Sequence, residues 1–373
     1  MKVLFIMYGR HNDVSINLTK SMNKKGILVD TFNVNNIVTF RCKNFKFPSL
    51  KPRNMINSVL SIVKYGKNWK NYFNRTTYAF CLMSKAVDKY IRQVKERYDI
   101  VLQWGGLFSA SLNKKGSLPY ILYLDHTYAI SKRYPHIPGL LDPPIQDKKW
   151  EMREREIYEK ADKIFTMSNF VKNSLIHDYH IPSKKIIVVG LGANVNPLLS
   201  TKRKKYDNKK ILFVGIEFNR KGGEVLLDAF SIVKKVIRDA TLIIVGCNLN
   251  ISQEGIEVRG FVSQDKMAKI YEEVSLFVLP SIRDHSPHVL LEAMSYKLPC
   301  IATNVEAIPE IIVDGKTGII VPAMDSMILA EKIIFILQYE EHMSRMGEEG
   351  YKRVKESFNW DLVASRMVNE LKK

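Results

Sequence analysis

Short apolar runs alternate with amphipathic stretches along the first half of the chain. Each run is about five residues long and rich in β-branched and aromatic side chains, which is typical of a buried strand. The predicted strands are Val3 to Met7, Ile27 to Phe32, Ile100 to Gln103, Tyr120 to Leu124, Lys163 to Met167 and Ile186 to Val189. Helical patterns lie between them, as at Ala79 to Arg97 and Lys149 to Glu159. Strands separated by helices indicate βαβ units and a parallel sheet.

The same alternation starts again after a polar break from Asn196 to Lys210, which contains a proline and a basic cluster. The second set of predicted strands is Ile211 to Val214, Thr241 to Val245, Ile256 to Arg259, Leu276 to Leu279, Cys300 to Thr303 and Ile319 to Val321. A chain of 373 residues is long enough for two domains. We predict an α/β fold of two doubly wound, Rossmann-like domains facing a central cleft, with residues 1–196 and 211–356 as the domains and 197–210 as the linker.

Basic residues are concentrated near the start of the chain. Residues 1–110 hold nineteen Lys or Arg against five Asp or Glu, which accounts for +14 of the total formal charge of +19. Residues 41–75 hold nine basic and no acidic residues, interleaved with aromatic ones, and this mixture suits an anionic membrane surface. The candidate membrane-docking residues are Lys64, Lys67, Trp69 and Lys70. Single-stranded nucleic acid, or a basic face that is only solvated, would fit the same pattern.

The rest of the composition excludes several classes of protein. The four cysteines are far apart and form no CxxC, so the sequence indicates neither a disulfide framework nor a thiolate zinc site. Phosphate-loop, HExxH, GxSxG and complete GxGxxG motifs are absent. No DxD occurs, so we expect no bound metal and no cofactor. Neither a targeting segment nor a run of ~18 apolar residues is visible, so we expect a cytoplasmic protein that meets a membrane only from its surface.

Two loops in the second half carry residues suited to a diphosphate. The first follows the strand that ends at Val214: after Gly215, the adjacent cations Arg220 and Lys221 precede two glycines and a helix. Cations beside a helix N-terminus form an anion site, because the unpaired N–H groups and the helix dipole point the same way. The alternative is a surface loop in which the two cations are incidental.

The second loop follows the strand that ends at Pro280. Asp284 lies in this loop, and Ser286 and Pro287 have the pattern of an N-cap followed by proline at the first helical position. Glu292 would then lie about two turns into the helix, leaning toward its start. Carboxylates in these places can bind ribose or sugar hydroxyls, unless Asp284 is only a cap and Glu292 only a surface charge. The candidate donor-binding residues at the helix start are Ser286, Pro287, His288 and Val289.

Four segments follow one another in a characteristic order along the second half. They are FVG(x5)KGG, GFVSQDKMAKIYEEVSLFVLPS, D(x7)E and EAMSYKLPCIATNVEAIPEIIVDGKTGIIV. This order resembles the C-terminal domain of glycosyltransferase family four, and residues 161–194 resemble the end of that family's N-terminal domain. The resemblance extends from about Leu118 to the last residue. It implies the GT-B fold, a nucleotide-sugar donor, retention at the anomeric carbon and independence of metal. It also implies that a last helix, within residues 357–373, packs back on the N-terminal domain.

The resemblance assigns roles to residues of the second half. Lys221 matches the lysine that binds the donor diphosphate. The arginine expected after the strand-end glycine is replaced by Ile216, and Arg220 would supply that charge instead. Glu292 matches the carboxylate implied to bind the ribose. Asp284 replaces a glutamate implied to contact the donor sugar, so it keeps the charge and loses the reach of one methylene.

The resemblance also implies roles near three other strand ends. His126 follows the strand that ends at Leu124 and resembles the histidine that the family places at the reacting sugar, with Asp125 as the alternative polar group. Val262 belongs to a strand end implied to lie near the base of the donor. The glycine-rich loop expected after the first strand is present only in part, as Gly9-Arg10.

These observations predict a retaining glycosyltransferase with His126, Lys221 and Glu292 as its catalytic residues. The expected donor is a UDP- or GDP-sugar, and the expected acceptor is a glycan or a lipid-linked glycan in surface polysaccharide, lipopolysaccharide or glycolipid synthesis. We expect the enzyme on the inner face of the cell membrane and expect no nucleic-acid partner. The alternatives are a GT-B epimerase or phosphorylase, which the KGG and D(x7)E segments disfavour, and a nucleic-acid-binding protein, which would leave the second half unexplained.

Overall fold

The chain divides into two compact units. The computed structural model describes residues 1–9, 13–34, 39–42, 45–48, 62–63, 73, 75–111, 118–133, 148–195 and 204–373. Within these residues, one unit runs to Gly190 and resumes from Ala364 to Lys373, and the other runs from Leu191 to Val363. Residues 197–203 of the expected linker lie outside the described part, and Lys210 is already the first residue of a strand.

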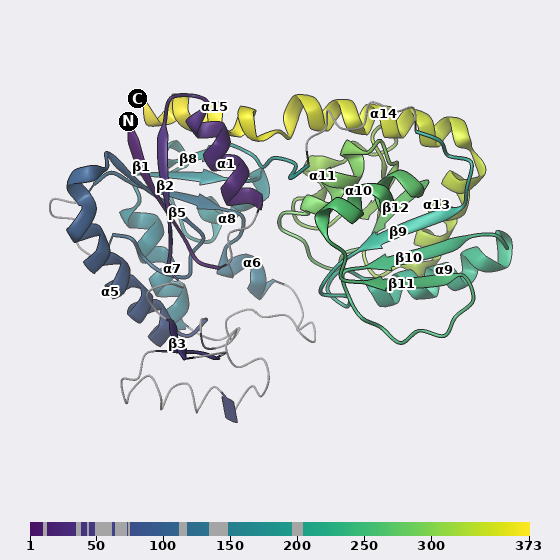
Figure 1. Cartoon of the computed structure of the whole chain (residues 1–373), viewed down its shortest axis with the longest axis horizontal. Helices are drawn as coiled ribbons and strands as arrows, with labels where there is room; N and C mark the ends of the chain where they lie inside the picture. Colours follow the sequence, from purple (N-terminus) through teal and green to yellow (C-terminus); the bar gives the residue numbers. More distant parts are fainter. Residues whose placement is uncertain are drawn as a thin grey trace. The chain divides into compact units, whose positions relative to one another are not determined.

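A parallel sheet forms the centre of the first unit (Figure 1). It has six strands in the order β2-β1-β5-β6-β7-β8. Each strand end lies within one residue of its predicted position. Four of these strands are largely buried and appear in the sequence as short continuous apolar runs. The strands are β1 (Lys2–Met7), β2 (Leu28–Asn33), β5 (Ile100–Trp104), β6 (Tyr120–Leu124), β7 (Lys163–Thr166) and β8 (Ile186–Val188).

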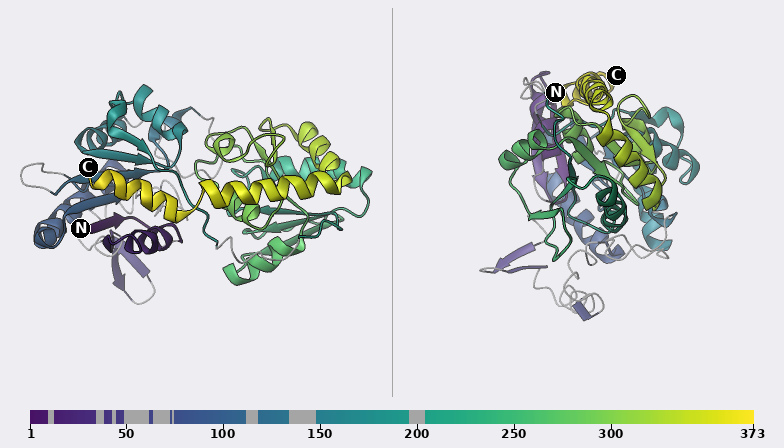
Figure 2. Two further views of the ribbon diagram at one scale, coloured as in Figure 1. Left: turned by 90° about the horizontal axis from the view of Figure 1, so that it is seen from above. Right: turned by 90° about the vertical axis from the view of Figure 1, so that its right-hand side faces the viewer.

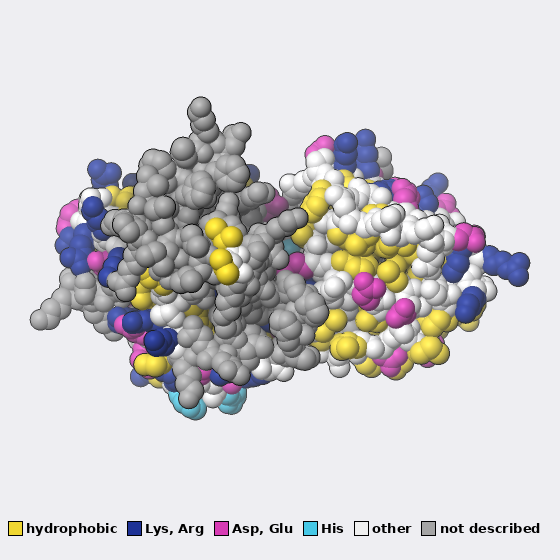
Figure 3. Space-filling model, turned by 90° about the horizontal axis from the view of Figure 1, so that it is seen from below, with side chains coloured by type: hydrophobic (Ala, Val, Ile, Leu, Met, Phe, Trp, Pro, Cys, Tyr) yellow, Lys and Arg dark blue, Asp and Glu magenta, His cyan; other side chains and the backbone are white. Residues whose placement is uncertain are grey.

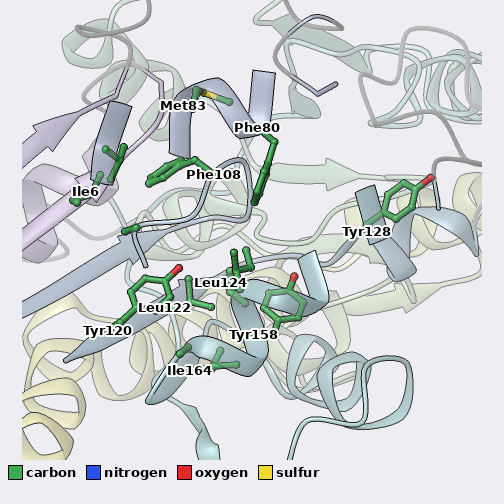
Figure 4. Close-up of a cluster of buried hydrophobic side chains, with 14 of the residues drawn as sticks. Ile6, Phe80, Met83, Phe108, Tyr120, Leu122, Leu124, Tyr128, Tyr158 and Ile164 are labelled. Atoms are coloured by element: carbon green, nitrogen blue, oxygen red, sulfur yellow. The ribbon is translucent and has the colours of Figure 1, made fainter. Parts of the chain in front are cut away.

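Helices cover this sheet and enclose a core of apolar side chains. Phe80 and Met83 of α5, Leu122 and Leu124 of β6 and Tyr158 of α7 belong to one buried cluster (Figure 4). The helices are α1 (Asp13–Asn23), α5 (Thr77–Val94), η2 (Lys95–Arg97), α6 (Tyr128–Lys132), α7 (Lys148–Lys160), α8 (Asn169–His177) and η3 (Ser183–Lys185). An antiparallel hairpin of β3 (Thr39–Cys42) and β4 (Phe45–Pro48), which the sequence analysis did not predict, lies in the basic stretch.

A second six-stranded parallel sheet forms the centre of the other unit, in the order β11-β10-β9-β12-β13-β14. Its strands also match the predicted ranges to within one residue. They are β9 (Lys210–Val214), β10 (Thr241–Val245), β11 (Ile256–Gly260), β12 (Leu276–Leu279), β13 (Cys300–Thr303) and β14 (Ile319–Val321). Both sheets reverse their strand order at the first strand of the unit, which is the doubly wound arrangement that the sequence predicted.

The helices of the second unit pack in pairs against its sheet. In Figure 1, α9 lies beside α13 and α11 beside α14. Ile211 and Phe213 of β9 belong to the core that α9 and α13 cover. The helices are α9 (Gly223–Val236), α10 (Gln264–Glu273), α11 (His288–Ser295), α12 (Ile308–Ile311), α13 (Ser326–Gln338), α14 (Glu340–Ser357) and α15 (Trp360–Leu371).

The start of α11 differs from the prediction. The helix begins at His288 with Pro287 as its N-cap residue, so Ser286 is not the N-cap and Pro287 is not the first helical residue. The cause is the backbone of Pro287, whose ψ of 74° lies outside the helical region. Glu292 therefore lies a little over one turn into α11 instead of two.

The last helix carries the chain back into the first unit (Figure 2). Arg366 of α15 donates from Nη1 to the carbonyl oxygen of Val189 at 3.0 Å, and Lys163 pairs with Glu370 at 3.3 Å. The start of α15 belongs to the second unit, where Trp360 donates from Nε1 to Asn194 Oδ1 at 3.2 Å.

The surface of the described residues contains exposed apolar side chains. Ile216 is 71% exposed and comes two residues after β9, and Phe261 is 68% exposed and directly follows β11. Figure 3 shows one face of the second unit, on which hydrophobic side chains gather among polar ones. In the part of the chain that the structure describes, no helix combines the length and the apolar character needed to cross a bilayer.

Candidate functional site

The loop after β9 places a lysine directly above the strand end. A side chain at Gly215 would bring its Cβ within 3.0 Å of Lys221 Cγ, so the bare glycine leaves room for the lysine stem. Gly222 caps α9 with a φ of 74°, a conformation that glycine adopts without steric cost. The loop therefore fixes Lys221 against the sheet and turns at once into the helix.

The loop after β12 lies beside the loop after β9 because the two strands are neighbours in the sheet. The N–H of Ile282 donates to the carbonyl oxygen of Arg220 at 3.0 Å, and Arg220 Nη1 donates to the carbonyl oxygen of Arg283 at 2.7 Å. The two predicted diphosphate segments, separated by about sixty residues, are thus joined at the carboxyl ends of the strands by one backbone hydrogen bond and one from the Arg220 side chain.

Lys221, Arg220 and Asp284 form one cluster across these loops, which we call the cation–carboxylate cluster. Lys221 Nζ pairs with Asp284 Oδ2, and Arg220 Nη1 lies 3.9 Å from Asp284 Oδ1. Ser281 also donates from Oγ to Asp284 at 3.2 Å, and Glu217 accepts from Arg220 at 2.6 Å. The structure brings together three residues that the sequence predicts to bind the donor.

Asp284 is ionised in this environment. Its side chain is only 5% exposed, and burial alone would raise the pKa of its carboxyl group. The positive charges of Lys221 and Arg220 outweigh the burial, and the pKa of Asp284 lies below its ordinary value. The carboxylate therefore holds Lys221 and Arg220 at the carboxyl ends of β9 and β12.

Glu292 has a different partner. Tyr271 of α10 donates from its hydroxyl to Glu292 Oε2 at 3.0 Å. Burial, reinforced by the negative charge of Glu292, raises the pKa of Tyr271 far above its ordinary value, so the hydroxyl keeps its proton and remains a donor. The two carboxylates of the D(x7)E segment thus take separate partners.

The other predicted donor-site residues of the second unit lie at strand ends or at the start of α11. The carbonyl oxygen of Ser286 accepts from the N–H of His288 at 2.8 Å, and the His288 ring lies 6.3 Å from the Trp360 ring. Val289 follows in the first turn, and Val262 comes two residues after β11; both are partly buried.

His126 follows β6 in the first unit. Its Nε2 lies 2.7 Å from Ser131 Oγ of α6, and the residue is partly buried, as is Asp125. Thr127 caps α6 by accepting from the N–H of Ile130 at 3.4 Å, and its Oγ1 lies 2.6 Å from Ser174 Oγ. The histidine is thus carried on a short, well-anchored turn.

A buried carboxylate that the sequence analysis missed supports this turn. Both oxygens of Glu154 accept from the N–H of Tyr128, at 2.9 and 3.1 Å, and Glu154 also accepts from the Tyr179 hydroxyl. Tyr179 in turn accepts from the N–H of Ala129 at 3.1 Å. Burial raises the pKa of Glu154 to about 7, although these hydrogen bonds oppose the shift. The only sequence signal for Glu154 is its position within an amphipathic helix.

Replacing Glu154 with Gln is expected to remove a pH dependence of stability. Because the folded protein binds the Glu154 proton more tightly than the unfolded chain, this stabilisation is complete below about pH 4.5 and is lost as the pH rises to about 7. The free energy of unfolding of E154Q relative to wild type should rise by about 3 kcal/mol over that range. Chemical denaturation at several pH values measures it. E151Q, one turn earlier and partly exposed, is the control, and parallel curves for E154Q and wild type would contradict the assignment.

Two further sequence predictions concern membrane docking and metal binding. The candidate docking residues Lys64, Lys67, Trp69 and Lys70 lie outside the described residues. Among the residues that are described, no three His, Cys, Asp or Glu side chains gather in an arrangement that could hold a metal ion.

Curated relatives of this chain are glycosyltransferases. A glycosyltransferase of Methanocaldococcus jannaschii is 29% identical over 69% of this chain and 69% of its own length. The capsular polysaccharide biosynthesis glycosyltransferase CapM of Staphylococcus aureus is 26% identical over 54% of this chain, and a phosphatidyl-myo-inositol mannosyltransferase of Mycobacterium leprae is 32% identical over 43%. The chain spans 59% and 45% of the lengths of these two relatives.

Solved structures share the fold over the full chain. Sucrose-phosphate synthase from Thermosynechococcus elongatus superposes with a TM-score of 0.73 at 17% identity, covering 100% of this chain and 98% of its own. Anabaena HepE, in complex with UDP and glucose, superposes with a TM-score of 0.68 at 13% identity, covering 100% of both chains.

Two family models account for most of the chain. The model of glycosyltransferase family 4 matches residues 17–196, and the model of glycosyl transferases group 1 matches residues 198–353. The predicted family and the predicted two-domain α/β fold are confirmed. This chain belongs to the group 1, family 4 glycosyltransferases and has their GT-B fold.

Proposed function

We propose that the protein transfers a glycosyl unit from a nucleoside-diphosphate sugar to an acceptor hydroxyl, with retention at the anomeric carbon and without a metal ion. The observation that carries this proposal is the cation–carboxylate cluster, which places two cations at the carboxyl ends of neighbouring strands β9 and β12. A diphosphate at this edge would meet Lys221 and Arg220 together with the start of α9.

The cluster fits the chemistry of the leaving group. When the bond between sugar and phosphate breaks, negative charge develops on the diphosphate, and cations held in place beforehand stabilise it without reorganising. Asp284 and Gly215 hold Lys221 in such a fixed position. In the front-side mechanism that the family resemblance implies, the departing phosphate accepts the proton of the acceptor hydroxyl. His126 is proposed to face the reacting sugar and Glu292 the ribose.

The relatives support a role in making surface glycans or glycolipids. CapM is named for capsular polysaccharide biosynthesis, and the Mycobacterium leprae relative is named for transfer of mannose to phosphatidyl-myo-inositol. HepE was solved with UDP and glucose. We therefore propose a UDP- or GDP-sugar as donor and a glycan or lipid-linked glycan as acceptor. The nine basic residues of 41–75 are proposed to bring the enzyme to an anionic membrane surface.

A thermal-shift screen tests the donor proposal. A nucleotide sugar present at about 100 times its dissociation constant should stabilise the native state by about 2.7 kcal/mol, which raises Tm by several degrees. We expect one of UDP-, GDP- and ADP-sugars to act in this way and expect the effect to be lost in Lys221→Ala. The proposal fails if none of them shifts Tm at millimolar concentration.

A further inference from the structure

Glu306 is a buried carboxylate in the loop after β13, close to the cation–carboxylate cluster. Its side chain has no exposed surface. Glu306 Oε1 accepts from Arg283 Nε at 3.1 Å, and Glu306 Oε2 lies 2.8 Å from His285 Nδ1, which donates to it when protonated at that nitrogen. One carboxylate thus binds the two residues that flank Asp284 in the chain.

A second contact ties the same two loops together. Thr303, the last residue of β13, donates from Oγ1 to the carbonyl oxygen of Ser281 at 2.6 Å. Ser281 in turn donates from its own Oγ to Asp284. The segment that carries Asp284 is therefore held at Ser281, Arg283 and His285 by residues of the next strand and its loop.

The backbone of Glu306 is strained. Its φ is 46°, in the left-handed region that residues with a side chain rarely adopt. Arg283, which faces it, has no exposed surface at all and needs an anion in contact. Glycine would adopt this φ without strain but has no charged side chain. Glu306 accepts the strain and supplies the anion that Arg283 needs.

We propose that Glu306 is a positioning residue for the donor site: it fixes Asp284 through Arg283 and His285, and Asp284 in turn fixes Lys221. This inference rests on the proposed function, because it takes the cation–carboxylate cluster to be the diphosphate site. The competing role is purely structural, with Glu306 only neutralising the buried charge of Arg283.

A double-mutant cycle separates these two roles. E306Q leaves Arg283 buried without an anion and should lower Tm by several degrees. The double variant R283M/E306Q removes both buried charges and should return Tm close to wild type, because a buried ion pair is often replaceable by neutral side chains. The Kd values for UDP-glucose and GDP-mannose, measured by titration calorimetry, are the second readout.

We expect the Kd of the bound donor to rise at least about tenfold in both E306Q and R283M/E306Q, because neither variant holds Asp284 at both flanks. Recovery of affinity together with Tm in the double variant would overturn the proposal and leave only the structural role. E306D provides a variant that keeps the charge opposite Arg283; it is one methylene too short for both contacts and should fold yet bind the donor more weakly. Wild-type affinity in E306D would also overturn the proposal.

The matched control is the ion pair of Lys297 and Glu348, whose charged atoms lie 2.8 Å apart. Lys297 precedes β13 and so lies near the amino end of that strand, whereas Glu306 follows its carboxyl end. K297M/E348Q should leave the Kd unchanged. If wild-type protein binds neither of these nor any other UDP-, GDP- or ADP-sugar, the proposed function itself fails. That outcome is distinct from a wild type that binds and a double variant that binds equally well.

Discussion

Lys221→Ala should lower the rate of sugar transfer by about 10² to 10³, the loss expected when one preorganised donor to a developing negative charge is removed. The reason is specific to the cluster, because Lys221 is the cation that Asp284 and Gly215 hold in place. Arg220 remains as the second cation but makes up for only part of the loss, since its guanidinium also donates to Glu217 and to the carbonyl oxygen of Arg283. Initial rates with the donor found in the thermal-shift screen provide the measurement.

The same substitution leaves Asp284 buried beside one cation instead of two, so loss of stability must be separated from loss of chemistry. K221A/D284N removes both charges of the pair and should recover Tm without recovering transfer. Lys235→Ala, an exposed lysine in the last turn of the same helix, is the matched control and should leave transfer unchanged. A folded Lys221→Ala protein with full transfer activity would refute the role of Lys221 and the site built around it.

Gly222→Ala should destabilise the protein by about 2 to 5 kcal/mol, which adds the strain of a left-handed alanine to that of overpacking. The φ of Gly222 is 74°, and a Cβ there would lie 1.8 Å from the carbonyl oxygen of Pro280. That oxygen belongs to the backbone at the end of β12, so relief requires the two donor loops to move apart. The midpoint of chemical denaturation measures the effect.

Gly315→Ala is the matched control for this prediction. Gly315 has nearly the same φ, 70°, but nothing lies within 4 Å of the position of its Cβ. It should cost only the left-handed strain, about 1 to 2 kcal/mol. Equal destabilisation by the two substitutions would contradict the prediction. It would show that the close approach of Gly222 to Pro280 adds nothing to the cost of Gly222→Ala.

The central strands were predictable because strands buried on both faces need continuous apolar runs, and these strands follow those runs to within a residue. The start of α11 was not predictable in this way. Ser286 and Pro287 have the residue types of a helix start, and only the backbone angles of Pro287 show that the helix begins one residue later. The cluster residues Lys221 and Asp284 were identified from local patterns next to strand ends. Their direct pairing depends on β9 and β12 being neighbours, which no local pattern specifies.

Glu154 and Glu306 were missed for a related reason. Each sits in an unremarkable local sequence, and its importance comes from partners elsewhere in the chain. Glu306 meets Arg283 and His285 only because β12 and β13 are adjacent, and Glu154 meets Tyr179 only because α7 and the end of α8 pack together. Charge in a buried place is invisible until the tertiary structure shows that the place is buried.

The return of α15 to the first unit has a consequence for the order of folding during synthesis. Domains usually fold as they leave the ribosome, the N-terminal one first. Here the contacts of Arg366 with Val189 and of Glu370 with Lys163 can form only after Arg366 and Glu370 have themselves been synthesised. The second unit, which runs to Val363, is therefore present in the nascent chain before residues 364–373 of the first unit. Of the two units, the one that is translated first is therefore the one that is completed later.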